Sequence, residues 1–361
     1  SLPSMQHVAR SRCGDLVRLR TVLIGFGHAA ATFGDDPFMA RWFPKASHLQ
    51  CLLGHEGFEL VGIADTAESA RVRARSRLPG VVVTNDTAEL AKLQPVVAVL
   101  AIPPQQRLAA IEALPDLRGI MLEKPLGLPA VRDPLVAVCA RRNIIAQVHF
   151  WRRGDPAMRD LGGGALIHRI GVAQAAFGLY GNGLRNNGSH LIDLVRMLLG
   201  PITAVRATSA FVHDPTLPLP GDGQLGFVLD LQSGAAVAVQ AVDFRHYREV
   251  ALDIWGTVGR LAVMQEGLSI SEYSLAENRG LANEREIASD RPAAIQCMAG
   301  AASPALYDNL AAALDGTARL LSPLSSACET ERVIDGLIAS AISGGACLKL
   351  EAGLVQMAAK L

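Results

Sequence analysis

The first 150 residues alternate between short apolar runs and longer segments of mixed polarity. Five runs rich in β-branched and aliphatic residues have the pattern of buried strands, at 21–24, 58–65, 95–102, 118–124 and 144–150. The segments between them have the pattern of helices, at 67–78, 87–93, 106–114 and 130–142. Strands that alternate with helices predict an α/β fold whose parallel sheet is covered on both faces. We therefore expect a doubly wound domain over residues 21–150, after a lead-in at 1–20.

The pattern changes after Phe150. Five segments alternate as strands and are separated by turn-rich pieces such as PLPGDG, at 202–211, 224–231, 235–243, 249–256 and 260–266. Two helical segments follow, at 305–314 and 328–343. We expect residues 151–361 to form a second α/β domain with a large, mostly antiparallel open sheet.

Charge and cysteine usage narrow the classes of partner. The 34 basic and 34 acidic residues cancel, which argues against a nucleic-acid or membrane-surface role driven by charge. No apolar stretch approaches the ~18–20 residues of a membrane span, and the N-terminus lacks the features of a secretory signal. The six cysteines lie far apart without a CxxC pair, which predicts reduced thiols and no metal site. We expect a cytoplasmic protein that recognises a small molecule.

A glycine-rich turn follows the first strand directly. Gly25, Gly27 and Ala30 form the pattern G-x-G-x-x-A, in which the first glycine permits the turn and the second lets a pyrophosphate approach the backbone. Asp65 ends the second strand, where a carboxylate would accept a hydrogen bond from a ribose 2′-OH. No arginine follows it immediately, which favours NAD over NADP. The context predicts a dinucleotide site, although any α/β protein can contain such a turn.

The distance from this turn to its acidic partner is unusual. Asp65 lies 40 residues beyond Gly25, against the usual ~20. The extra length is the segment 31–48, which contains four aromatic residues, Phe33, Phe38, Trp42 and Phe43. Such a segment could fold over the cofactor or the substrate, or pack on itself at the surface. The sequence leaves both alternatives open.

Two residues offer candidate proton-transfer chemistry. Lys124 in MLEKPLG ends the fourth strand, at the edge where open α/β sheets bind ligands, and Pro125 restricts its direction. It could move a proton during hydride transfer, or be an ordinary loop lysine. His190 lies in the first turn of an apolar helix, in RNNGSHLID. Asp193, one turn further on, can pair with Arg196 along the same helix.

In their order along the chain, several motifs resemble those of a known family. G-x-G-x-x-A, AIPPQQR, EKP, GSHLIDLVRMLLG and ALDIWGTVGRL are similar to motifs of the Gfo/Idh/MocA family of nicotinamide-dependent oxidoreductases, which act mostly on sugars, inositols and sugar nucleotides. The resemblance runs from about Arg20 to Leu350. It implies a Rossmann domain followed by an α/β domain whose open sheet forms a homodimer or homotetramer.

The resemblance also implies roles for individual residues. Lys124 corresponds to the EKP lysine, and His190 to the histidine that acts as acid and base. Arg152 stands where family members frequently have a substrate-contacting arginine, and we expect further substrate contacts from Tyr180, Asn186 and Asp193. The expected cofactor site consists of Gly25, Phe26, Gly27, His28, Ala29, Ala30, Asp65, Ile102, Pro103, Glu123 and Lys124.

Two positions depart from the family pattern. Arg107 replaces the histidine that usually ends the P-x-x-x-H loop, and Asn186 replaces the aspartate of D-x-G-x-H. An amide cannot accept a proton, so either Lys124 and His190 suffice or Tyr180 takes part. Several stretches also look similar to a branch of the family associated with unusual sugars of surface polysaccharides.

The sequence therefore predicts an NAD-dependent oxidoreductase that moves a hydride between nicotinamide and a carbon of a sugar, sugar nucleotide or inositol-like polyol. Two alternatives stay open, because a fold does not determine function. One is a regulatory protein that binds NAD or a sugar without turnover. The other is an NAD-assisted glycosidase, which would release free sugar with no net change in NADH. Retention of both Lys124 and His190 favours an enzyme.

Overall fold

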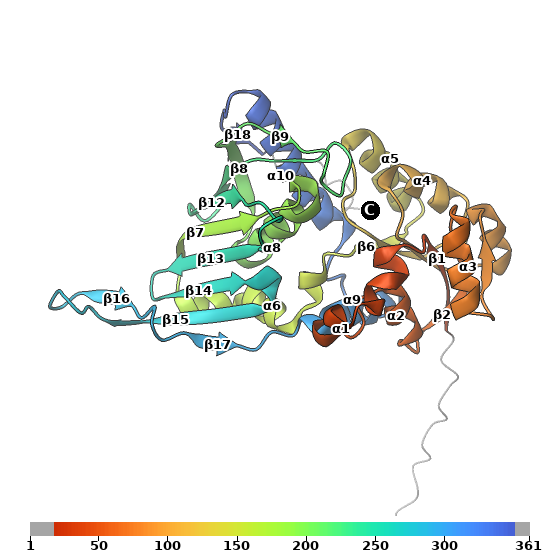
Figure 1. The fold of residues 1–361 in the computed structure, drawn as a ribbon, viewed down its shortest axis with the longest axis horizontal. Coiled ribbons are helices and arrows are strands. Elements are labelled where there is room, and N and C mark those ends of the chain that lie inside the picture. Colours follow the sequence, from red (N-terminus) through yellow and green to blue (C-terminus); the bar gives the residue numbers. More distant parts are fainter. Residues whose placement is uncertain (1–17, 351–361) are drawn as a thin grey trace, which may run out of the picture.

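Six parallel strands form the N-terminal sheet of this computed structural model, which describes residues 18–350 (Figure 1). Residues 1–17 of the expected lead-in, Cys13 among them, and residues 351–361 lie outside the described residues. The strands are β1 (Leu19–Ile24), β2 (Phe58–Ala64), β3 (Val82–Thr84), β4 (Val97–Leu100), β5 (Gly119–Leu122) and β6 (Ile145–Val148). Their order is β3-β2-β1-β4-β5-β6, with every pair parallel. This is the doubly wound order of dinucleotide-binding domains, and it confirms the predicted fold class.

Helices connect these strands where the sequence predicts them, with one difference in type. They are α3 (Glu68–Arg77), η3 (Thr87–Leu93), α4 (Pro104–Glu112) and α5 (Pro129–Arg141), of which η3 is a 3₁₀ helix. Between β1 and β2 the chain forms four short helices, η1 (His28–Thr32), η2 (Phe33–Asp35), α1 (Pro37–Trp42) and α2 (His48–Leu53). The extra segment after the glycine turn is therefore helical.

The second sheet is large, mixed and mostly antiparallel, as predicted. Its strands are β7 (Ala173–Tyr180), β8 (Ile202–Ala207), β11 (Phe227–Leu231), β12 (Ala236–Ala241), β13 (Ala251–Gly256), β14 (Gly259–Met264), β15 (Ser269–Glu277), β16 (Arg285–Ile287), β17 (Ala293–Ile295) and β18 (Leu348–Lys349). Strands β9 (Val212–His213) and β10 (Gly223–Gln224) pair separately. The order is β16-β15-β14-β13-β7-β12-β11-β8-β18, with β17 beside β15. The pair β7–β12 is parallel and the other pairs are antiparallel.

Short helices cover one face of this sheet. They are η4 (Trp151–Gly154), α6 (Pro156–Asp160), η5 (Leu161–Ala165), α7 (Leu166–Ile170), η6 (Leu184–Gly188) and α8 (Ser189–Leu199), and the turn η7 (Gln265–Gly267) joins β14 to β15. The apolar side chains of α8 that predicted a core helix, such as Leu191, Leu194 and Val195, are buried against the sheet. On the opposite face, Phe177 is 54% exposed.

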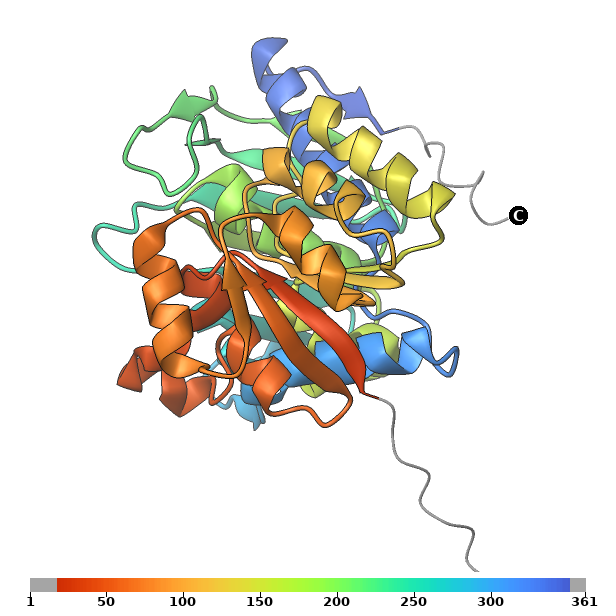
Figure 2. The same cartoon turned by 90° about the vertical axis from the view of Figure 1, so that its right-hand side faces the viewer.

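Of the two last helices, the first returns to the N-terminal lobe, whereas the second packs mainly on β8 and α8. They are α9 (Ala299–Leu314) and α10 (Leu324–Ile342). Helix α9 lies beside α1 and α2 (Figure 1) and buries Leu306, Tyr307 and Leu310 in a core shared with Leu23 and Val99 of the parallel sheet. Figure 2, seen from the N-terminal lobe, shows the parallel strands in front of the C-terminal lobe. No helix within residues 18–350 combines the length and apolar character needed to cross a membrane.

Candidate active site

The glycine turn directly follows β1, and its first two glycines have different surroundings. Gly25 has φ +91°, and a Cβ there would lie 2.4 Å from the carbonyl oxygen of Ala101, so only glycine fits. Gly27 is exposed, and a Cβ there would meet nothing within 4 Å. The turn therefore has a fixed backbone at Gly25 and open space beside Gly27. Of the other expected cofactor residues, Ile102 lies against this turn, since its Cγ2 is 3.1 Å from the Cβ position of Gly25.

Asp65 lies beside the same turn. Its Oδ2 accepts a hydrogen bond of 2.7 Å from the backbone N–H of Phe26, which joins the end of β2 to the glycine loop. Arg71, six residues further along α3, donates to the backbone carbonyls of Asp65 and Thr66 at 2.8 Å each. Because Arg71 lies six residues beyond Asp65, the positions that directly follow Asp65 gave no sign of this arginine.

Lys124 joins the two lobes. It follows β5, and the peptide bond to Pro125 is cis. Its Nζ donates to the backbone oxygen of Asn186 at 2.9 Å and to the side-chain Oδ1 of Asn186 at 3.0 Å. Burial lowers the pKa of Lys124, and the nearby charge of Arg152 lowers it further. The asparagine at the position of the family aspartate is therefore the hydrogen-bonding partner of the lysine.

A carboxylate that the sequence did not single out holds this asparagine. The Oδ2 of Asp222 accepts from the backbone N–H of Asn186 at 3.0 Å, and its Oδ1 accepts from Arg185 at 3.1 Å and Gly223 at 2.9 Å. Asp222 is buried. It therefore satisfies the first amides of η6, the turn that leads into α8. The only signal in the sequence was its place in the turn PLPGDG.

His190 lies in the first turn of α8, as predicted. Its ring stands edge-on to Phe150, with centroids 5.7 Å apart. Burial lowers the pKa of His190 well below its ordinary value, and the charges of Lys124 and Arg152 act in the same direction. Within residues 18–350, no hydrogen bond engages its ring nitrogens. The imidazole is therefore neutral at pH 7 and has a nitrogen free to accept a proton.

Arg152 is buried next to these groups. One of its N–H groups, at Nη2, donates to the backbone carbonyl of Glu266, and the guanidinium lies 4.4 Å from the ring centroid of Trp151. Its Nε and Nη1 have no hydrogen-bond partner among the residues that the structure describes. Burial lowers the pKa of Arg152 to about 10. Two buried donors thus stay available for a ligand.

Two expected substrate residues lie in the interior instead. The hydroxyl of Tyr180 donates to the carbonyl of Leu225 at 2.8 Å and accepts from its N–H at 3.0 Å, and the side chain is fully buried. Asp193 is also buried and forms a salt bridge with Arg153, with a closest N···O distance of 2.8 Å. Its pairing with Arg196, at 3.7 Å, is present as the helical spacing predicted. Both side chains support the lobe rather than line the site.

Arg107, the other departure from the family pattern, connects two loops of the site. Its Nε donates to the carbonyl of Ile102 at 3.0 Å, and its Nη1 donates to the carbonyl of Pro125 at 2.8 Å. The side chain is buried. Arg107 therefore fixes the loop after β4, which includes Pro103, against the loop that carries Lys124.

Glu123 has two histidine partners that the sequence did not predict. His48 Nε2 lies 2.9 Å and His149 Nδ1 lies 3.1 Å from its Oε1. Burial favours the neutral acid, but the two histidines outweigh it and hold the pKa of Glu123 well below its ordinary range. The partners lie 75 residues before and 26 residues after Glu123, so no local motif could reveal them.

The segment 31–48 was expected either to fold over the cofactor or substrate or to pack on itself at the surface, and it fits neither alternative completely. Phe38 and Trp42 are largely exposed, so they do not pack on the segment itself. Phe43 stands edge-on to Trp151, with centroids 5.4 Å apart, and His48 reaches Glu123. The segment is thus anchored at its end beside the predicted site, while its middle faces solvent.

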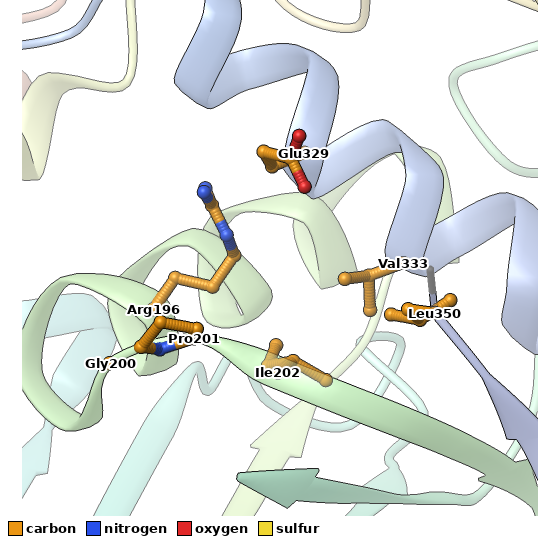
Figure 3. A pocket seen from close by; sticks show the side chains of 7 residues that line it. All are labelled: Arg196, Gly200, Pro201, Ile202, Glu329, Val333 and Leu350. Atoms are coloured by element: carbon orange, nitrogen blue, oxygen red, sulfur yellow. The ribbon is translucent and has the colours of Figure 1, made fainter. Parts of the chain in front are cut away.

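A hollow elsewhere in the molecule is unrelated to these residues. It has a volume of about 300 Å³ and lies where α8, β8 and α10 meet (Figure 3). Its lining consists of Arg196, Gly200, Pro201, Ile202, Glu329, Val333 and Leu350. None of the residues expected to bind cofactor or substrate belongs to it.

Part of the chain is similar to a known protein family. Residues 144–262 match the family model described as GFO/IDH/MocA C-terminal domain. This segment is similar to a Gfo/Idh/MocA C-terminal domain. This match covers the strand β6, the histidine helix α8 and the greater part of the second sheet. It confirms the family resemblance predicted from the motifs. No curated protein matches the chain by sequence.

Solved structures share the fold over nearly the whole chain. An oxidoreductase from Agrobacterium radiobacter in complex with NAD+, L-tartaric acid and magnesium is 16% identical with a TM-score of 0.70, covering 94% of this chain and 100% of that one. The WlbA dehydrogenase from Bordetella pertussis, in complex with NADH and UDP-GlcNAcA, is 17% identical with a TM-score of 0.68, covering 93% and 100%. An NAD binding oxidoreductase from Klebsiella pneumoniae is 19% identical with a TM-score of 0.70, covering 93% and 100%. At these identities the similarity shows the fold.

Proposed function

We propose that this protein is an NAD-dependent oxidoreductase acting on a hydroxyl-bearing carbon of a sugar, sugar nucleotide or inositol-like polyol. One observation carries the proposal. Lys124, at the ligand-binding edge of the parallel sheet, is hydrogen-bonded to Asn186 in the turn that leads to His190. Two structures with the same fold hold NAD+ or NADH, and one of them also holds UDP-GlcNAcA, which supports this class of substrate.

The glycine turn and Asp65 would hold the cofactor. The open space beside Gly27 suits a pyrophosphate, and the carboxylate of Asp65 has lone pairs left for a ribose hydroxyl. Bound there, a nicotinamide cofactor would supply the hydride acceptor or donor. Arg71 could also meet a 2′-phosphate, but its Nη1 is already bonded to the carbonyls of Asp65 and Thr66, so we propose NAD.

The other residues of the site would transfer the proton and bind the substrate. His190 accepts the proton of the substrate hydroxyl as the hydride leaves the same carbon, because its imidazole is neutral at pH 7. Lys124 turns from Asn186 to donate a hydrogen bond to the reacting oxygen. Arg152 contributes its two unpartnered N–H groups to a further oxygen of the substrate. Such donors suit polyols, which present many acceptors.

The proposal is tested by separating cofactor binding from turnover. NADH and NADPH binding is followed by fluorescence, and turnover is measured on a panel of sugars, sugar nucleotides and inositols. We expect tighter binding of NADH, and a loss of turnover of about 10²-fold or more in His190→Gln with NADH binding retained. Lys124→Ala should lose turnover as well, whereas the exposed Lys92→Ala serves as a matched control.

Unchanged turnover in Lys124→Ala would contradict the role of this lysine. Binding of NADH without turnover of any compound in the panel would identify a regulatory protein instead. Release of free sugar from glycosides without net change in NADH would identify an NAD-assisted glycosidase.

A further inference from the structure

Three side chains that can bind a metal converge beside Lys124. His48 begins α2, Glu123 follows β5, and His149 follows β6. The carboxyl ends of parallel strands are where open α/β sheets bind ligands. The Nε2 of His48, the Oε1 of Glu123 and the Nδ1 of His149 all lie within 4.8 Å of one another. The proposed hydride transfer uses no metal ion, so it assigns none of these three residues a metal-binding role.

The far side of each imidazole is fixed by α9. The Nδ1 of His48 is 2.7 Å from the hydroxyl of Tyr307, and the Nε2 of His149 is 3.0 Å from the Oγ of Ser303. Histidines that bind metals commonly use the second ring nitrogen in a hydrogen bond that holds the ring orientation. The two hydroxyls can donate or accept, so they hold the rings in either tautomer. Both imidazoles are therefore held with the remaining nitrogen directed at the same carboxylate oxygen.

We propose that His48, Glu123 and His149 bind a divalent first-row transition-metal ion. The three ligand atoms form a triangle: Glu123 Oε1 lies 2.9 Å from His48 Nε2 and 3.1 Å from His149 Nδ1, and the two nitrogens lie within 4.8 Å of each other. An ion equally distant from all three atoms could therefore lie no more than about 2.5 Å from each. Zinc binds imidazole nitrogen and carboxylate oxygen at about 2.0–2.2 Å, so shifts of a few tenths of an ångström complete the site. Two imidazoles and one carboxylate suit zinc, cobalt, iron or manganese better than calcium or magnesium.

The ion has open coordination positions in this site. His48 is buried, but the side chains of Glu123 and His149 keep 17% and 15% of their surface exposed. Three protein ligands leave at least one position for water or a ligand oxygen. The competing arrangement is a hydrogen-bonded triad, in which each near nitrogen carries a proton and donates it to Glu123. The two arrangements differ in whether an ion displaces those protons.

Metal binding alone tests the proposal, without cofactor, substrate or turnover. The full chain is treated with a chelator and titrated with Co²⁺, followed by visible absorption, and Zn²⁺ is then added in competition. We expect one Co²⁺ per chain with a Kd below about 10 μM, displaced by Zn²⁺. His48→Gln, Glu123→Gln and His149→Asn should each weaken binding at least tenfold.

His55→Gln is the matched control, because His55 follows α2 and pairs with Asp308 of α9 at 3.1 Å but lies outside the triad. It should bind Co²⁺ like the wild type. If His48→Gln fails to fold by circular dichroism, the more exposed His149→Asn gives the same test. Absence of Co²⁺ binding up to about 100 μM, or binding that persists in the triad variants, would establish the hydrogen-bonded triad and overturn the proposal.

Discussion

His190 shows how one side chain acquires its chemistry from its surroundings. The ring belongs to α8, a helix whose apolar face does not depend on this histidine. Burial and the charges of Lys124 and Arg152 lower its pKa, so the imidazole is a proton acceptor at neutral pH. In the absence of these surroundings, a histidine would be partly protonated near pH 6.5. The environment, rather than the residue type alone, supports the proposed role.

The lowered pKa makes a prediction about stability. The unfolded chain protonates His190 near pH 6.5, whereas the folded chain does so only at lower pH, so acid favours unfolding. The free energy of unfolding of the wild type minus that of His190→Gln should be constant above pH 7. Below pH 6.5 it should fall by up to ~1.4 kcal/mol per pH unit. Urea unfolding of both proteins from pH 5 to pH 8 measures this difference, and a difference that grows on acidification would contradict the prediction.

At the scale of elements, the turn η6 depends on Asp222. This carboxylate accepts the backbone N–H groups of Arg185 and Asn186, which the start of a helix would otherwise leave unpaired, and also that of Gly223. Because η6 carries Asn186 and leads to His190, Asp222 positions both groups of the proposed site.

Removal of this carboxylate should therefore cost stability. We expect Asp222→Ala to lower the free energy of unfolding by about 2 kcal/mol, at the upper end for a helix cap, since the site is buried. Asp214→Ala is the control, because Asp214 lies in the same loop but is not buried, and within residues 18–350 its carboxylate accepts hydrogen bonds only from Thr216. Urea unfolding compares the two variants, and equal effects would show that Asp222 has no special part.

Most elements could be predicted from the sequence, and the misses have physical reasons. Strands β1, β2, β4, β5 and β6 are β-branched runs beside clear helices. Half of strand β7, AQAAFGLY, is alanine and glycine, and it has no β-branched residue, so it lacks that signal although it is central in the second sheet. Strand β3 has only three residues.

The site was predictable where a motif is local. Lys124, Asn186 and His190 lie in recognisable stretches, and the structure brings their segments together. His48 and His149 become neighbours of Glu123 only through the fold. Tyr180 was expected at the site because it precedes the histidine motif, but it ends a strand whose alternation directs its ring into the core. Sequence proximity did not determine which way the side chain points.

At the scale of the whole molecule, the second sheet has one open face. Phe177 stands opposite Asp253 on the neighbouring strand, and Arg260 lies between the rings of Trp255 and Tyr273, 4.6 Å from each centroid. A face of this kind, with aromatic and arginine side chains over several strands, has the composition of a protein interface.

We expect this face to join two or four copies of the chain. Phe177→Arg would place a charge at its centre and shift the protein to monomers, because a buried unpaired charge is costly. Light scattering after size-exclusion chromatography gives the mass of each species. Val72→Arg, at an equally exposed position on α3, should leave the mass unchanged. A monomeric wild type would contradict the prediction.

The position of α9 has a consequence for folding during synthesis on the ribosome. The parallel sheet is complete at residue 148, but the helix that covers part of it ends at residue 314. At usual rates of translation the intervening chain takes on the order of 10–30 s to appear. During that time the apolar surface awaiting Leu306 and Leu310 stays uncovered. We therefore expect the nascent N-terminal lobe to bind chaperones, and a fragment that stops near residue 150 to aggregate.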